Sequence, residues 1–328
     1  MRVVSTSSLP IDLAALFPNT RVDVPDRWAG VESLDLADAD ALICLLLDRI
    51  DAAVLARAPK LRVVANCAVG YDNVDVAAAT AAGVAVANTP DVLTEATAEL
   101  AWALIFAAAR RLGEGERLVR GRAWEGWRLD QLLGVPLAGR TLGVVGMGRI
   151  GRAVATRAAA FGMRVIWSDP HAPDAVPLDG RDLFPAGSAA EWRRGSIDEL
   201  FATADVVSLH CPLTPATRHL VDAARLARMK PTAILVNTAR GGCVDEDALI
   251  AALRAGRIFG AALDVYAREP EIDPRFYDCP RLTLAPHIGS ATTETRARMA
   301  KLCADAVIEV LAGRRPANLV NPDVVIRG

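Results

Sequence analysis

Runs of β-branched and other apolar residues alternate with helical stretches along this chain, and the alternation limits the folds open to it. From Thr141 onward the strand-like runs are TLGVVG, RVIWSD, DVVSLH, TAILVN, GAALDV and LTLAP. Residues 1–90 carry a weaker version, with RVVS, TRVDV, ALICLLL, LRVVANC and VAVAN. Because this alternation is typical of βαβ units, the sequence predicts an α/β protein with two doubly wound parallel-sheet domains.

Length and charge exclude several classes of partner. The 328 residues suffice for about two domains. Lys and Arg number 37 against 39 Asp and Glu, so no excess positive charge attracts nucleic acid or an anionic membrane. The longest apolar stretch, residues 100–109, is shorter than the ~20 residues that cross a bilayer and predicts a buried helix. We therefore expect a small-molecule partner, no nucleic acid and no membrane.

The N-terminus and the cysteines indicate the compartment. The opening MRVVSTSSLP lacks the apolar core of a secretory signal, so a cytoplasmic location is expected. The six cysteines are scattered without a CxxC pair, which predicts no metal site and ordinary buried thiols.

A glycine-rich turn follows the strand-like run at Thr141. In TLGVVGMGRIG, Gly146 permits a tight turn, Gly148 lets the backbone approach a pyrophosphate, and Gly151 lets the next helix pack on the strand. Arg149 and Ile150 open that helix, whose free N–H groups favour phosphate. The sequence predicts a dinucleotide-binding site here.

Asp169 ends the next strand, close to the usual spacing of about 20 residues after the glycines. Its carboxylate can accept hydrogen bonds from the ribose hydroxyls and repel a 2′-phosphate, which favours NAD over NADP. A nearby arginine would still admit NADP, and a solvated strand-end carboxylate is the other alternative. The segment from Pro170 to Arg194 is rich in Pro, Gly and Asp and predicts a long surface loop.

Arg240, Glu269 and His287 fall at or just beyond strand ends, where ligands bind in parallel sheets. An arginine can grip a carboxylate with two hydrogen bonds, a histidine can exchange a proton with an alkoxide, and a carboxylate can fix the tautomer of that histidine. Together they suit hydride transfer between a nicotinamide and a 2-oxo or 2-hydroxy acid. The alternatives are a surface arginine and a loop carboxylate.

Five motifs in order carry a resemblance. GMGRIG with Asp169, then HCPLTPATRHL, NTARGGCVDEDAL, ALDVYAREP and PHIGSAT, resemble the D-isomer-specific 2-hydroxyacid dehydrogenase family, and most closely its glyoxylate and hydroxypyruvate (D-glycerate) reductase branch. The resemblance implies that Arg240, Glu269 and His287 form the catalytic triad. It also implies further contacts: Asp264 and Thr97 with the cofactor, and the backbone of Val69 and Gly70 with the substrate carboxylate.

The remaining expected cofactor contacts lie on neighbouring segments. Pro212 offers an apolar face for an adenine pocket, beside which we expect His210 to pack. The other expected contacts are Thr217, Thr238 and Gly289.

The family layout is discontinuous. It implies a flavodoxin-like substrate domain made of residues 1–96 and 288–328, into which a Rossmann NAD-binding domain of residues 97–287 is inserted. The predicted helix at 294–311 and the tail ANLVNPDV agree with that layout. The WEGW tract at 124–127 resembles the dimerisation arm of the family, which implies a homodimer, although local packing is an alternative.

The expected activity is NAD-dependent reduction of glyoxylate or hydroxypyruvate. A 2-ketogluconate reductase is a further candidate. Val69 stands where phosphite-oxidising relatives carry lysine, and Glu269 where formate dehydrogenases carry glutamine, which disfavours both activities. The rival of another class is an NADH-sensing corepressor-like binding protein. Corepressors typically carry extra terminal segments, and this sequence shows none, so an enzyme is expected.

Overall fold

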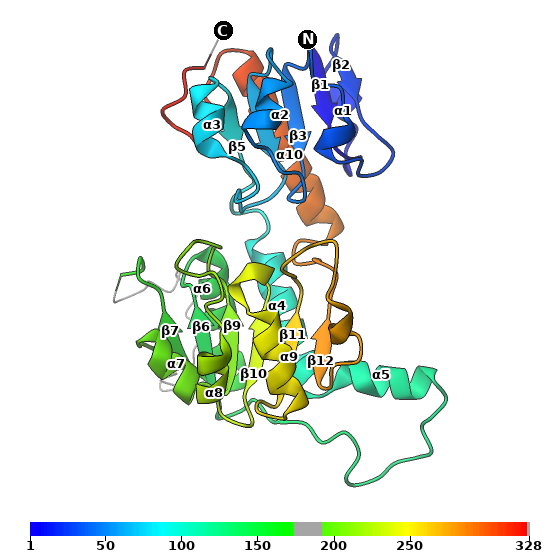
Figure 1. Cartoon of the computed structure of the whole chain (residues 1–328), viewed down its shortest axis with the longest axis vertical. Coiled ribbons are helices and arrows are strands. Elements are labelled where there is room, and N and C mark those ends of the chain that lie inside the picture. The colour runs from blue at the N-terminus through cyan, green and yellow to red at the C-terminus, as the bar shows by residue number, and fades with distance from the viewer. Residues whose placement is uncertain (174–191, 327–328) are drawn as a thin grey trace. The chain divides into compact units, whose positions relative to one another are not determined.

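The computed structural model describes residues 1–173 and 192–326. Their contacts divide the chain into unit 1, Met1–Leu93 with Ser290–Gly328, and unit 2, Thr94–Gly289. Figure 1 shows a sheet with its own helices in each unit. The expected bounds were 1–96 with 288–328 and 97–287, and α4 begins at Thr94.

Unit 1 contains a parallel five-stranded sheet in the order β2-β1-β3-β4-β5, the flavodoxin-like order. Its strands are β1 (Arg2–Ser5), β2 (Arg21–Asp23), β3 (Ala41–Cys44), β4 (Val63–Asn66) and β5 (Ala85–Ala87). Its helices are α1 (Leu13–Leu16), α2 (Ala52–Ala56), α3 (Val76–Ala81) and α10 (Thr293–Leu311), with a 3-10 turn at Val31–Ser33.

The C-terminal segment completes unit 1. Helix α10 packs its buried face, which includes Cys303 and Val307, into the core beside β3 and β4. The tail then returns to β5, where the N–H of Val320 donates to the carbonyl of Val86 at 2.7 Å. The side-chain oxygen of Asn321 accepts the N–H of Val86 at 2.8 Å. Residues more than 200 positions apart in the sequence are thus hydrogen-bonded at the edge of this sheet.

Unit 2 contains a seven-stranded parallel sheet in the order β12-β11-β10-β9-β6-β7-β8, which is the Rossmann order with one added strand. Its strands are β6 (Thr141–Val145), β7 (Arg164–Ser168), β8 (Trp192–Arg194), β9 (Val206–Leu209), β10 (Ile234–Asn237), β11 (Gly260–Leu263) and β12 (Leu282–Leu284). Its helices are α4 (Thr94–Ala109), α5 (Leu112–Arg120), α6 (Arg149–Ala158), α7 (Ile197–Thr203), α8 (Ala223–Arg228) and α9 (Glu246–Arg254). Short 3-10 turns occupy Ala159–Phe161, Gly241–Cys243 and Pro274–Phe276.

Two apolar cores lie on opposite faces of this sheet. Helices α4 and α6 contribute to one core, and α7, α8 and α9 to the other. The predicted buried helix at residues 100–109 lies within α4, where Ile105 is fully buried. Over residues 1–173 and 192–326 no helix combines the length and the apolar character needed to cross a membrane. The doubly wound α/β prediction is confirmed for both sheets.

The prediction of a surface loop from Pro170 to Arg194 was wrong at the C-terminal end of that segment. Residues Trp192–Arg194 form β8, which pairs with β7 in parallel. Residues 174–191 of that segment lie outside the described part of the chain. A three-residue edge strand is too short to show an alternating pattern. The cation of Arg194 lies 5.5 Å from the ring centre of Trp167, a tertiary contact that the sequence does not reveal.

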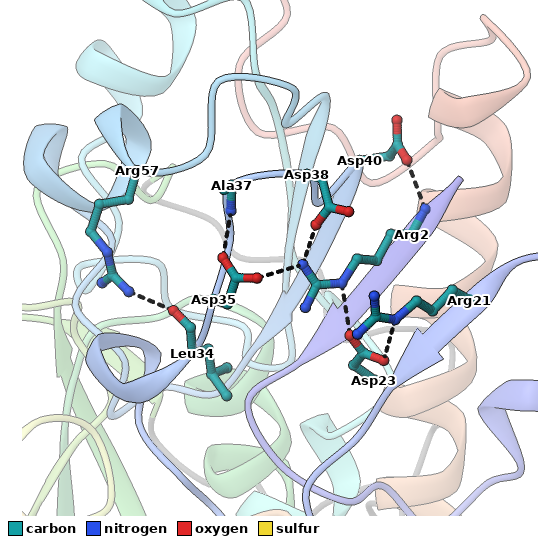
Figure 2. A network of polar contacts seen from close by, with 9 residues as sticks. All are labelled: Arg2, Arg21, Asp23, Leu34, Asp35, Ala37, Asp38, Asp40 and Arg57. Carbon is teal, nitrogen blue, oxygen red and sulfur yellow. Dashed lines mark hydrogen bonds and ion pairs between the residues drawn. The ribbon is translucent and has the colours of Figure 1, made fainter.

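A buried arginine joins three segments of unit 1, as Figure 2 shows. The side chain of Arg2 is 9% exposed, and its Nε donates to Asp23 on β2 at 2.7 Å. Its terminal nitrogen bonds Asp38 and reaches Asp35 at 3.4 Å. Burial acts to raise the pKa of Asp23, but hydrogen bonds from Arg2 and Arg21 outweigh burial and lower this pKa below 3.8. The hydrogen bond from Arg2 likewise lowers the pKa of Asp38.

Acid should therefore destabilise unit 1 through this network. A carboxylate whose pKa is lowered on folding stabilises the fold above its unfolded pKa, and this stabilisation is lost as the pH falls through the lowered value. We expect Arg2→Met to lower the melting temperature of unit 1 at about pH 6, and the gap from the wild type to narrow toward about pH 2.5. Thermal melts across this range check it, and Arg21→Met, which removes the 65% exposed partner of Asp23, should show the same trend with a smaller gap. A gap that stays constant with pH would contradict the assignment.

Candidate active site

Three neighbouring strands of unit 2 carry Arg240, Glu269 and His287 on the segments that follow them. Arg240 follows β10, Glu269 follows β11 and His287 follows β12. The order β12-β11-β10 places these strands side by side and in parallel. Their carboxyl ends therefore meet at one edge of the sheet, where ligands bind in folds of this kind.

Glu269 and His287 are in direct contact. The Nδ1 of His287 lies 2.6 Å from the Oε2 of Glu269, and their side chains are 27% and 15% exposed. The other carboxylate oxygen of Glu269 accepts the N–H of Tyr266 at 2.8 Å. His287 has a φ of 54°, an unfavourable region for a side chain of this size, and its N–H donates to the carbonyl of Asp264 at 2.8 Å. With Nδ1 on the carboxylate, Nε2 is the ring nitrogen that can exchange a proton with a ligand.

Asp264 fixes the turn that follows His287. Its two oxygens accept the N–H groups of Ile288 at 2.7 Å and Gly289 at 2.8 Å. Burial raises the pKa of Asp264, while these hydrogen bonds oppose the increase. A Cβ at Gly289 would lie 3.3 Å from Asp264 and 3.5 Å from Thr97, so the structure brings together three of the expected cofactor residues.

The backbone around Arg240 is held against the loop that carries Glu269. The side chain of Asn237 donates to the carbonyl of Arg240 at 2.9 Å, and Arg240 donates to the carbonyl of Ala239 at 2.8 Å. At Gly241 a Cβ would lie 1.9 Å from the carbonyl carbon of Tyr266. Only glycine can follow Arg240 at this close approach.

The three glycines of the turn between β6 and α6 have different surroundings. Gly146 has a φ of +91°, and a Cβ at Gly151 would lie 2.0 Å from the carbonyl oxygen of Gly146. A Cβ at Gly148 would meet nothing within 4 Å, and Gly148 and Arg149 are exposed while Ile150 is half-buried. Packing therefore requires Gly146 and Gly151, whereas Gly148 leaves open space at the start of α6 that suits a pyrophosphate.

Asp169 lies beside this turn. One carboxylate oxygen accepts the N–H of Met147 at 2.7 Å, and the other accepts the N–H of His171 at 2.8 Å. The guanidinium of Arg194 donates to the backbone carbonyl of Asp169 at 3.0 Å. The carboxylate and an arginine thus occupy the end of β7 together.

The other expected cofactor residues differ in how they are engaged. The Oγ1 of Thr238 at the end of β10 is buried and has no hydrogen-bond partner within the described protein, as expected of a group awaiting a ligand. The hydroxyl of Thr217 donates to the carbonyl of Pro212 at 2.6 Å, which holds their turn. His210 bonds the hydroxyl of Ser208 at 2.8 Å, and burial lowers the pKa of His210 to about 3, so the ring is neutral at pH 7.

Val69 and Gly70 lie in unit 1, just beyond β4. The side chain of Asn88 donates to the carbonyl of Val69 at 2.8 Å, and that of Asn66 to the carbonyl of Gly70 at 2.9 Å. The two asparagines thus fix the orientation of this backbone turn.

Sequence reasoning did not identify Tyr266, Met147 and Ser208 as parts of the site. Alternation along the strand gives a signal for Ser208, because it and His210 point to the same side. Met147 and Tyr266 act through backbone N–H groups, which leave no signal in residue type.

Comparison with known proteins decides the family. Residues 102–289 match the model of the D-isomer specific 2-hydroxyacid dehydrogenase, NAD binding domain. The chain belongs to this family. A glyoxylate reductase from Aeropyrum pernix is 49% identical over 294 residues, covering 88% of this chain and 84% of the relative.

Solved structures agree with this assignment. A Thermus thermophilus protein matches with a TM-score of 0.88 and 44% identity, over 98% of this chain and all of that one. An NADPH-dependent glyoxylate/hydroxypyruvate reductase from Sinorhizobium meliloti, in complex with NADP and malonate, matches with a TM-score of 0.85 and 29% identity, over 100% and 98% of the chains.

The resemblance read from the five motifs is therefore confirmed, including the glyoxylate reductase branch. The chain is an NAD(P)-dependent oxidoreductase acting on the CH–OH group, with an NAD-binding domain over most of unit 2 and a small-molecule substrate. Among residues 1–173 and 192–326, no group of three or more His, Cys, Asp or Glu side chains could hold a metal ion.

Gly148, which is exposed, and Gly151, which is packed against backbone, give a matched test of the turn that is expected to bind the cofactor. Gly148→Ala should leave the melting temperature nearly unchanged and weaken NADH binding about tenfold or more, since its methyl group enters only the space for the pyrophosphate. Gly151→Ala should cost about 2 kcal/mol or more of stability, because its methyl group meets backbone. Thermal melts and fluorescence titration with NADH measure both, and full NADH affinity in Gly148→Ala would contradict this site.

Proposed function

We propose that this protein uses NADH to reduce a small 2-oxo acid, either glyoxylate to glycolate or hydroxypyruvate to its D-2-hydroxy acid. The 2.6 Å contact between His287 and Glu269 carries the proposal, because it provides an oriented proton donor at the same edge of the sheet as Arg240. The glyoxylate reductase of Aeropyrum pernix, 49% identical, supports this substrate class.

Each residue has a distinct part in the proposed reaction. The guanidinium of Arg240 binds the substrate carboxylate and polarises the adjacent carbonyl. NADH, held by the glycine-rich turn, would supply the hydride for the carbonyl carbon when bound. The Nε2 of His287 gives its proton to the oxygen, and Glu269 stabilises the charged imidazole before the transfer. The 2-oxo acid gains a hydride and a proton, and solvent later returns the proton to His287.

The proposal extends to the remaining site residues. The proposal includes the N–H groups of Val69 and Gly70 as donors to a carboxylate, and the hydrogen bonds from Asn88 and Asn66 to their carbonyls hold this backbone turn. Asp264 and Thr97 receive the nicotinamide end of the cofactor, with Thr238 and Gly289 nearby. His210, Pro212 and Thr217 border the adenosine end. Gly146, Gly148, Arg149, Ile150 and Gly151 bind the pyrophosphate.

Assembly and location are part of the same proposal. Trp127 and Leu129 are 79% and 82% exposed on the segment after α5, and Trp124 and Leu133 are also exposed. An exposed apolar segment of this kind supports a homodimer. No disulfide joins any of the six cysteines, all of which lie in the described part of the chain, and this supports a reducing, cytoplasmic compartment.

Oxidation of NADH in the presence of glyoxylate, hydroxypyruvate or 2-ketogluconate tests the reaction. Arg240→Ala should lower kcat/KM about 100-fold or more through loss of the charge-assisted contacts. His287→Gln should lower it by about 100- to 10,000-fold through loss of the general acid. Tight NADH binding without turnover on any 2-oxo acid would instead favour the corepressor-like function.

Asp169 should decide the choice between NADH and NADPH. Its carboxylate would repel a 2′-phosphate, so Asp169→Ser should raise the ratio of kcat/KM for NADPH to that for NADH about tenfold or more. Arg194 close by should assist the variant. A wild-type enzyme that prefers NADPH would contradict the role assigned to this carboxylate.

A further inference from the structure

Tyr266 contacts the segments that carry all three residues of the proposed mechanism. It lies on the loop between Asp264 and Glu269 and is 6% exposed. Its own N–H donates to Glu269 at 2.8 Å, and its carbonyl packs against Gly241, which follows Arg240. Its hydroxyl donates to the carbonyl of Ala285 at 2.8 Å, on the segment that leads to His287.

The hydrogen bond from the Tyr266 hydroxyl connects the loop after β11 with the segment after β12. Ala285 is 8% exposed, and its N–H donates to the carbonyl of Leu263 at 2.8 Å. The phenol of Tyr266 satisfies the carbonyl of the same residue, so both polar backbone groups of Ala285 are bound to the β11 segment. His287 follows two residues later in a strained backbone conformation that requires such support.

We propose that Tyr266 is a positioning residue whose hydroxyl holds His287 at bonding distance from Glu269. Its role rests on the proposed function, since it acts only through those two residues. The Glu269 carboxylate is held by the backbone of Tyr266, and the segment before His287 is held by its side chain. One residue thereby sets both ends of the 2.6 Å contact.

The phenol remains a donor at any working pH. Burial raises the pKa of Tyr266 well above its usual value of 10.0, and the charges of Asp264, Glu269 and Glu246 raise it further. The ring also packs on Phe276, with centres 6.3 Å apart. A phenylalanine at 266 keeps this packing and the backbone N–H, and it removes only the hydroxyl, which bonds the carbonyl of Ala285 at 2.8 Å and reaches that of Leu263 at 3.4 Å.

The test is Tyr266→Phe, with kcat and KM for glyoxylate reduction measured separately. We expect kcat to fall about fivefold to tenfold, as for the loss of buried hydrogen bonding, with the affinity for NADH within about twofold of the wild type. KM for glyoxylate should also stay within about twofold, because Tyr266 acts on the proton donor and not on substrate binding.

Two controls separate positioning from simple destabilisation. Tyr277→Phe removes the same group from a side chain that is 66% exposed, and it should change nothing. Phe276→Leu removes the ring packed against Tyr266 but keeps the hydroxyl. It should lower the melting temperature and leave kcat within about twofold of the wild type. A kcat of Tyr266→Phe equal to that of the wild type would overturn the proposal.

A second measurement does not depend on turnover. The short contact between His287 and Glu269 should give a downfield proton resonance in NMR spectra, assigned by its absence in His287→Gln. Tyr266→Phe should shift or broaden this resonance, whereas Phe276→Leu should not. If the wild type reduces no 2-oxo acid, the proposed function fails, and this resonance still decides whether Tyr266 positions the pair.

Discussion

The parallel pairing of β10, β11 and β12 is the constraint on which the site depends. Each strand ends at the same edge of the sheet, and each is followed by one of the side chains of the proposed mechanism. A helix or an antiparallel hairpin in place of any one strand would send its side chain elsewhere. The apolar residues of these strands, such as Leu235 and Leu263, therefore serve the chemistry by fixing the register of the sheet.

Backbone N–H groups hold all three carboxylates of the site. Asp169 accepts from Met147, Asp264 from Ile288 and Gly289, and Glu269 from Tyr266. A backbone donor has no rotamers to lose, so it orients a carboxylate at little cost in entropy. Met147, which donates to Asp169, follows β6, and the donors to Asp264 follow β12. The donor to Glu269 lies three residues earlier on the same loop. The fold thus positions its charges by where its strands and turns end.

The sequence was sufficient to predict the parts of the molecule that depend on residue type and spacing. It predicted two doubly wound sheets, the helix that begins after Gly148 and the C-terminal helix α10. Each of these has a regular apolar pattern or a glycine-rich turn in the sequence. It missed β8, since three residues at an edge show no pattern. It also missed Tyr266, whose two decisive bonds run from its own backbone and to a carbonyl 19 residues away. Such partners become known only when the strand order places them together.

The hydrogen bonds of Asp169, at the end of β7, hold the glycine-rich turn and also bear on the proposed choice between NAD and NADP. Both oxygens of Asp169 accept a backbone N–H, one from the glycine-rich turn and one from His171. Each oxygen of a carboxylate has a second lone pair, so the ribose hydroxyls of NAD can still donate to it. A 2′-phosphate brings negative charge instead of a donor, and the fixed carboxylate cannot turn away without losing its bonds to the turn. In the proposed site, selection against a 2′-phosphate would therefore follow from the same hydrogen bonds that hold Asp169 to the glycine-rich turn.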